Sequence, residues 1–300
     1  MKSGLWWGLL GVAAFSFTVP LTRVAVDGDG LGPLFTGAGR AVVAALLAGA
    51  ALLFTRQRLP QGRQWVRIAI VAGGIVIGFP LFTSFALTSS TANHGAVVIA
   101  LLPAATAVVA VARTRERPPR LFWMLTAFGA IAAVIFTGVH GDGIGNFHWS
   151  DALLFGAVLT AAFGYAEGGL LSRELGAWQT VSWALVLSAP LMAALTAYSV
   201  YQETPSAEPS QWASFLYLCV ISMFLGFFAW YRGLAIGPMA QVSQIQLTQP
   251  VMSICWATII LGEPLTTMTI MGGLAVILCA ASAVHVRIKN TTPSSPNEKK

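Results

Sequence analysis

The chain has 300 residues, of which 56% are hydrophobic and only 9% are charged, whereas soluble domains carry roughly a quarter charged residues. Together with a mean hydropathy of +0.73, this composition excludes an ordinary soluble fold. The formal net charge of +6 would suggest a nucleic-acid partner in a soluble protein, but here the positions of the basic residues account for it, and no nucleic-acid partner is expected.

Apolar stretches long enough to cross a bilayer, about 20 residues each, recur along the whole chain. We therefore predict an all-α polytopic membrane protein with ten transmembrane helices and no separate soluble domain. The predicted spans are 4–22, 31–54, 67–87, 93–112, 121–139, 151–171, 178–200, 211–232, 240–261 and 266–287. No convincing cleavage site follows the first span, so we expect it to be a retained helix. Residues 289–300 are polar and are expected to form a disordered cytoplasmic tail.

Basic residues are unevenly distributed between the predicted loops. With the N-terminus in the cytoplasm, Lys and Arg fall almost entirely on the inner side or in the tail, with Arg23 and Arg40 as the exceptions. The predicted outer loops contain acids but no Lys or Arg. This bias predicts a multi-pass protein of the bacterial inner (plasma) membrane with both termini in the cytoplasm.

Two parts of the chain match in register, which predicts an internal repeat. A gap-free alignment pairs residues 147 positions apart, namely Leu87 with Leu234, Pro103 with Pro250, and Glu116 with Glu263. A weaker match places Arg23 beside Arg173. Five spans followed by five more give the second half the opposite orientation, an inverted repeat that is typical of transporters. We predict one five-helix repeat over 1–140 and a second over 141–288.

Several segments together resemble a known transporter family. They are GRAVVAALL around Arg40, ALTSSTANHGAVVIALLPAATAVV and RERP in the first half, and FLGFFAWYRGLAIGPMAQVSQIQLTQPVMS and LGEPLT in the second. On these segments the chain resembles the EamA-type ten-helix transporters of the drug/metabolite transporter superfamily, and among them the YddG-type bacterial amino-acid exporters. The resemblance implies two inverted halves, a central cavity lined chiefly by spans one, three, four, six, eight and nine, and outward movement of small metabolites. In one departure, the first half reads TRERP where the second reads LGEP.

We expect a secondary transporter that exports aromatic and other neutral amino acids, and related small metabolites, by alternating access. Efflux of amphipathic drugs or organic cations is the alternative, and an intramembrane enzyme or a passive channel is less favoured. No phosphate loop followed by GKS or GKT, no HExxH and no well-placed GxSxG occurs in the sequence, so we expect no enzyme activity, no cofactor and no metal. We expect a monomer.

Pro103 and Pro250 each remove a backbone donor and should kink spans four and nine. Either the kinks are purely structural, or they are gating hinges that line the pathway. The same half of span nine is rich in polar residues, which make interhelical bonds or face the substrate. We expect Gln244 and Thr248, one turn apart, to bind substrate.

Aromatic side chains are dense on the spans that the resemblance places around the cavity. Packing or an interfacial belt is the alternative reading for most of them. The residues that we expect to contact substrate on these spans are Phe17, Phe79, Phe82, Thr83, Tyr165 and Trp230. An apolar, aromatic cavity with uncharged polar groups suits neutral, zwitterionic or flat aromatic solutes.

Four charged or titratable residues are candidates for functional or structural roles. Charge within the membrane is a functional hypothesis by default, so Arg40 couples charge to transport or simply braces helices. Glu167 is either a proton-sensitive group or a side chain that extends to the inner interface, and a direct pair with Arg40 is doubtful. His94 is either part of a pH-sensitive gate or a satisfied surface histidine. Glu263 is predicted to mark a helix end, capping or tethering the turn into span ten.

Overall fold

The computed structural model describes residues 2–28, 30–114, 119–140, 148–236 and 245–291, and their regular structure is entirely helical. In chain order the elements are α1 (Lys2–Ser16), α2 (Thr18–Val26), α3 (Pro33–Phe54), α4 (Arg63–Val71), the π-helix η1 (Ala72–Gly78), α5 (Phe79–Ala86), α6 (Ala92–Ile99), α7 (Leu102–Thr114), α8 (Arg120–His140), α9 (Trp149–Leu175), α10 (Ala177–Gln202), α11 (Pro209–Tyr217), the π-helix η2 (Leu218–Leu225), α12 (Gly226–Ile236), the 3₁₀ turn η3 (Gln246–Thr248), α14 (Gln249–Leu261) and α15 (Thr267–Thr291).

Ten helical runs correspond to the ten predicted spans. Within the described ranges, seven runs are long and apolar enough to cross a membrane: Gly4–Val26, Pro33–Phe54, Arg63–Ala86, Ala92–Arg113, Trp149–Leu175, Ala177–Gln202 and Pro209–Ile236. Three shorter apolar helices complete the set: Arg120–Phe136, Gln246–Leu261 and Thr267–Ser282. The predicted all-α membrane fold is confirmed. The predicted start of the disordered tail is wrong, because α15 continues to Thr291 and so takes up the first residues of the predicted tail.

Spans one, four and nine are interrupted just before a proline. The break between α1 and α2 precedes Pro20, the break between α6 and α7 precedes Pro103, and η3 precedes Pro250. Proline has no N–H to donate to the carbonyl four residues earlier, and its ring clashes with that carbonyl. The interruptions in spans four and nine are those that the sequence predicts, whereas the one in span one was not predicted.

Spans three and eight each contain a π-helical segment. The first ends at Gly78 and the second at Leu225, which are again 147 residues apart, the offset of the sequence repeat. A π-segment widens the helix locally and frequently marks a functional position. The structure therefore extends the internal repeat to a feature that the residue-by-residue alignment does not show.

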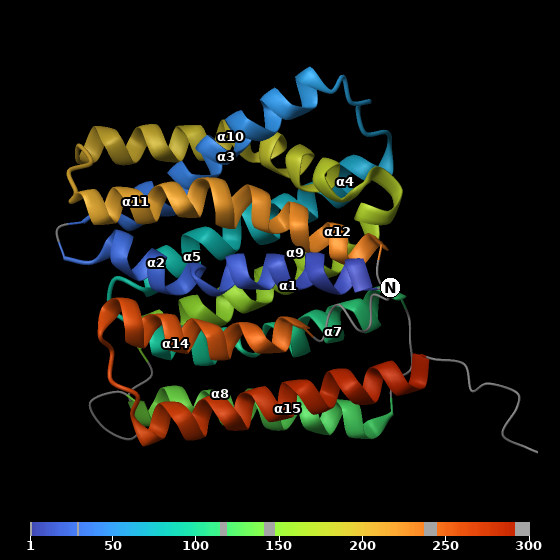
Figure 1. Ribbon diagram of the computed structural model, residues 1–300, viewed down its shortest axis with the longest axis vertical. Coiled ribbons are helices and arrows are strands. Elements are labelled where there is room, and N and C mark those ends of the chain that lie inside the picture. The colour runs from blue at the N-terminus through green and yellow to red at the C-terminus, as the bar shows by residue number, and fades with distance from the viewer. Residues whose placement is uncertain (1, 29, 115–118, 141–147, 237–244, 292–300) are drawn as a thin grey trace, which may run out of the picture.

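The helices of the two halves are interleaved. In Figure 1, α3 runs alongside α10 at one edge of the bundle, and α8 runs alongside α15 at the other. Between these edges α1 packs along α12, and α9 packs along η1 and α5. Each of these pairs joins a span of the first half to a span of the second, so the halves are interlocked and do not form separate lobes.

Glycine permits the closest of these crossings. A Cβ added to Gly74 in η1 would lie 2.5 Å from the carbonyl oxygen of Thr160 and 2.7 Å from the backbone nitrogen of Gly164, both in α9. Only a residue without a side chain allows two helix backbones to approach this closely. The contact holds span three directly against span six.

The two ends of the bundle differ in charge. The end where α1 begins, here called the N-terminal end, carries the Arg-rich connection from α3 to α4, and the connections at the opposite end contain the acids (Figure 1). Arg23 lies at the opposite end, where its Nη1 donates to the carbonyl oxygens of Leu87 (2.7 Å) and Thr88 (3.0 Å). Arg23 departs from the basic bias because it caps the end of span three.

Candidate functional site

A small cavity lies at the centre of the bundle, between helices of both halves. This central cavity is lined by Phe15, Thr18, Arg40, Ile75, Phe79, Pro80, Tyr165, Ser222, Met223, Phe227 and Gln249. Its lining includes residues of both π-segments, since Ile75 belongs to η1 and Ser222 and Met223 belong to η2. The free space of about 20 Å³ is enough for roughly one water molecule, so the cavity is closed in this conformation.

A second void lies beside the central cavity, at the interrupted parts of spans four and nine. It has a volume of about 10 Å³ and is lined by Val19, Ala96, Ile99, Leu102, Pro103, Gln246, Gln249, Pro250 and Ser253. Gln249 lines both spaces. The two prolines of the repeat therefore meet at one point, next to the central cavity.

Arg40 is the charged residue of the central cavity. It projects from α3 and is only 1% exposed. Its Nη1 lies 3.5 Å from the hydroxyl of Thr22, and its Nη2 lies 3.3 Å from the hydroxyl of Thr83, both beyond the usual hydrogen-bond distance. Its Nε has no hydrogen-bond partner among the described residues. The guanidinium is thus buried with only two long bonds to neutral groups.

Two glutamines of span nine are also incompletely bonded. Gln249 is 7% exposed and Gln246 is 4% exposed. Within the described part of the chain, the Oε1 of Gln249 and the Nε2 of Gln246 have no hydrogen-bond partner. Burying such groups without partners is costly, so these positions are suited to bind a polar ligand.

Hydrogen bonds tie spans eight, nine and one together. The hydroxyls of Thr18 and Ser222 lie 2.8 Å apart. Ser253 donates to the carbonyl oxygen of Ser16 (2.8 Å), the carbonyl that Pro20 leaves without its helical donor. Trp256 Nε1 donates to the Ser16 hydroxyl (2.9 Å). We call spans one, eight and nine the second three-helix unit, to distinguish them from the first, which comprises spans three, four and six.

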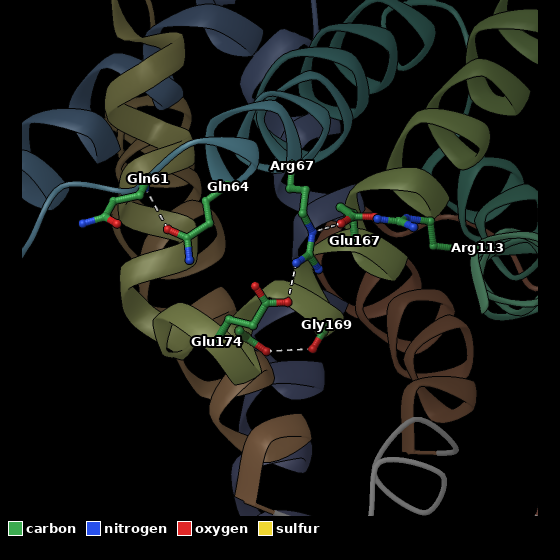
Figure 2. Close-up of polar contacts among 8 residues, drawn as sticks. Gln61, Gln64, Arg67, Arg113, Glu167, Gly169 and Glu174 are labelled. Carbon is green, nitrogen blue, oxygen red and sulfur yellow. Dashed lines mark hydrogen bonds and ion pairs between the residues drawn. The ribbon is translucent and has the colours of Figure 1, made fainter.

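An ion-pair cluster ties spans three, four and six together near the N-terminal end (Figure 2). Glu167 of α9 accepts from Arg67 of α4 and, at 2.8 Å, from the Nε of Arg113 of α7. Arg67 also donates to Glu174, which lies about two helical turns beyond Glu167 on α9. We call spans three, four and six the first three-helix unit.

Glu167 occupies the middle of this cluster. Its side chain is 4% exposed and lies between two arginines, an arrangement that stabilises a charged carboxylate. Glu167 therefore does not pair with Arg40. Its position indicates a structural role, in which it links α9 to α4 and α7. A proton-sensitive role stays a prediction.

A second bond holds the first unit together at the opposite end. The Nε2 of His94 in α6 lies 2.7 Å from Oδ1 of Asp151 in α9, and Asp151 Oδ2 accepts from the N–H of His148 at 3.0 Å. His94 is 8% exposed. The reading of His94 as a surface histidine is wrong, because the start of α9 covers it. A role in a pH-sensitive gate stays a prediction.

Glu263 caps a helix, but not the helix that the sequence suggested. Its carboxylate accepts from the N–H groups of Ala92 (2.7 Å) and Asn93 (2.8 Å) at the start of α6, where an anion is favoured. The expected tether to span ten is thus replaced by a bond to span four. Together with the bonds of Arg23, it joins the two three-helix units at the opposite end of the bundle.

Replacing Glu263 by Gln is expected to lower the free energy of unfolding by about 1 kcal/mol, a usual value for a lost helix cap. The substrate profile should remain unchanged, because Glu263 lies outside both cavities. The melting temperature of the purified protein in detergent measures the effect. Glu203→Gln, at an exposed acid on the same end, is the control and should leave it unchanged. An altered substrate profile with wild-type stability would contradict this assignment.

The structure brings some of the predicted substrate residues together. Phe79 and Tyr165 line the central cavity. Thr83 is not part of the cavity lining, but its hydroxyl accepts from the Nη2 of Arg40. Phe82 instead packs against Gly156 of α9, outside the lining of either cavity.

Other predicted residues lie elsewhere. Phe17 stacks on Trp256, with the ring centroids 4.4 Å apart. Trp230 is buried, with its ring 6.3 Å from that of Tyr165. Thr248 is exposed and donates to the carbonyl oxygen of Ile245, so this placement does not support contact with substrate. Gln244 lies outside the described residues.

The 3₁₀ turn explains why the sequence favours Thr248, and not Gln249, as a substrate-binding residue. In a 3₁₀ turn, side chains three residues apart share a face, so Gln246 and Gln249 point together into the voids and Thr248 turns outward. The prediction assumed a continuous α-helix, in which residues four apart share a face. The proline at position 250 was the available signal for a change of register.

Comparisons with known proteins agree with this architecture. The family model of the EamA-like transporter family matches residues 2–138 and 148–284. The chain is 42% identical over 277 residues to the uncharacterized transporter YdeK of Bacillus subtilis (strain 168), covering 92% of this chain and 95% of YdeK. It also resembles a protein of known crystal structure with a TM-score of 0.64 and 18% identity, over 97% of this chain and 100% of that chain, a likeness of fold alone.

Proposed function

The chain belongs to the EamA-like transporter family of multi-pass membrane proteins, and we propose that it exports amino acids, aromatic and other neutral ones, and related small metabolites by alternating access at the central cavity. It would act as a monomer in a bacterial inner membrane, with both termini in the cytoplasm and the repeats divided near residue 140. The observation that carries the proposal is the composition of the central cavity.

The cavity combines a few polar groups with aromatic walls. Phe15, Phe79, Tyr165 and Phe227 provide the aromatic part, and Arg40 provides the charge. Ligand sites commonly have this character, with mostly apolar walls and a few polar groups that fix orientation. A buried guanidinium repels cations, so the cavity favours amino acids over the organic cations of the alternative reading.

Transport requires the closed cavity to enlarge. About 20 Å³ cannot hold an amino acid, so the surrounding helices must move apart. Since the sequence halves are interlocked, we propose that the moving bodies are the two three-helix units, which contain helices of both halves. The breaks at Pro103 and Pro250 line one void, and both π-segments line the central cavity, so we propose them as the hinges.

The cavity must open to each side in turn. At the opposite end, the bonds of Glu263 to α6 and of Arg23 to Leu87 and Thr88 hold the two units together. Opening on that side would break these bonds. A ligand drives such a change only through different affinities for the two states.

Purified protein in liposomes loaded with radiolabelled phenylalanine or threonine is expected to release the amino acid faster than protein-free vesicles. The flux should saturate and show counterflow, because a carrier has a finite number of sites that face one side at a time; a passive channel would show neither. The assay should be run with and without a pH gradient, which tests for proton coupling. Flux at the level of empty vesicles, alongside robust drug flux, would reject the proposal in favour of drug efflux.

A further inference from the structure

We propose that Arg40 and Gln249 recognise the two charged ends of an α-amino acid, so that the guanidinium binds the α-carboxylate and the Gln249 side-chain oxygen accepts from the α-ammonium. This inference rests on the proposed function and assigns the residues that define its substrate class. Both side chains line the central cavity, and both are more than nine-tenths buried.

Arg40 carries a charge that its surroundings do not satisfy. A buried ion is costly unless it is paired and fully hydrogen-bonded. Arg40 has only the long bonds to Thr22 and Thr83, and none of the described acids forms an ion pair with it. Its Nε–H is unused in the described part of the structure. A carboxylate matches the planar fork of a guanidinium in both charge and geometry.

Gln249 supplies the complementary group. Its Oε1 is an acceptor without a donor among the described residues, and an ammonium group has donors but no acceptor. Aromatic rings that line the same cavity, such as Tyr165 and Phe227, attract a cation through their faces. They also provide an apolar surface for the substrate side chain. A donor cation and a neutral acceptor in one cavity fit a zwitterion better than an amine or an acid alone.

Arg40 also connects the site to the moving parts. Its Nη1 reaches Thr22 of span one and its Nη2 reaches Thr83 of span three, so it touches both three-helix units. A carboxylate that takes up these donors would compete with both threonines. Substrate binding would therefore change contacts that both units make with α3.

The test begins with the wild-type protein, because Arg40 variants could fail to fold. Binding of radiolabelled phenylalanine to purified protein in detergent is competed with four probes: unlabelled phenylalanine, phenylalanine amide, phenethylamine and 3-phenylpropionate. The first has both charged groups, the next two lack the carboxylate, and the last lacks the ammonium. We expect each incomplete probe to compete about tenfold or more weakly than phenylalanine, as expected for the loss of a charge-assisted bond. Equal competition by phenethylamine would overturn the carboxylate assignment.

Variants then assign each end of the ligand. Arg40→Gln should weaken binding of phenylalanine about tenfold or more and should not weaken binding of phenethylamine. Gln249→Leu should weaken phenylalanine and leave 3-phenylpropionate unaffected. Arg232→Gln is the control, since Arg232 is an exposed arginine over the Trp7 ring, and it should bind like wild type. If Arg40→Gln does not fold, the wild-type competition series decides.

The outcomes separate this inference from the proposed function. Amino-acid flux with equal competition by all four probes would overturn the inference and leave the function in place. Carboxylate-dependent binding without any amino-acid flux would support the inference and reject the proposed transport function. A folded Arg40→Gln protein that still discriminates phenylalanine from phenethylamine would overturn the role of Arg40.

Discussion

Gly74→Ala is expected to reduce the amount of folded protein sharply, whereas Gly73→Ala is expected to leave it unchanged. The added Cβ would lie 2.5 Å from the Thr160 carbonyl oxygen and 2.7 Å from the Gly164 nitrogen, so α9 would have to shift. Overpacking usually costs about 1–3 kcal/mol, and we expect the upper end of that range or more, because the contacted atoms belong to the backbone and cannot rotate away.

Gly73 is the matched control because it is the neighbouring residue of the same π-segment. Apart from its chain neighbours and the backbone of its own helix, a Cβ there would have no atom within 4 Å, and the glycine is exposed. Expression as a fluorescent fusion, followed by size-exclusion chromatography and thermal melting in detergent, gives the amount of folded protein and its stability. A Gly74→Ala protein with the wild-type elution profile and melting temperature would show that spans three and six are not packed as described.

Glu167→Gln is expected to lower the free energy of unfolding by about 3 kcal/mol, the lower end of the range for breaking a buried ion pair. The substitution removes the charge that Arg67 and Arg113 share and leaves Arg67, with a side chain 16% exposed, with Glu174 alone. Glu174→Gln is expected to cost less than about 1 kcal/mol, because Glu174 is 50% exposed.

Thermal melting of the two variants in the same detergent measures this difference. The double variant Arg113→Gln/Glu167→Gln should lose less than the sum of the two single losses, because residues in direct contact couple. Equal losses for Glu167→Gln and Glu174→Gln, or strict additivity in the double variant, would show that the cluster does not hold spans three, four and six together.

Much of the fold follows from the sequence because its signals are local. Apolar length predicts the ten spans, and Pro103 and Pro250 predict two of the interruptions. The π-segments were not predicted, since the apolar residues around Ala72 and Leu218 are compatible with either kind of helix. Hydropathy measures the apolar character of a segment. It does not indicate whether a helical turn contains one extra residue.

The site was less predictable because it depends on contacts between distant segments. Arg40 is a candidate because charge within the membrane is a functional hypothesis by default, and Phe79 and Tyr165 are candidates because the family resemblance places their spans around the cavity. Gln249 was passed over because a 3₁₀ turn changes which side chains share a face. Likewise, nothing in the sequence near His94 indicates that Asp151 lies beside it, since that contact exists only once span six has packed on span four.

The paired π-helices bear on the ancestry of the protein. One extra residue within an α-helix produces a π-turn, and the two halves carry such turns ending at Gly78 and Leu225, in the same register as the repeat. Independent insertions would have had to occur twice at equivalent positions. The simplest history is that an ancestral five-helix chain already contained the insertion, and that gene duplication then gave each half a copy, both of which now line the central cavity.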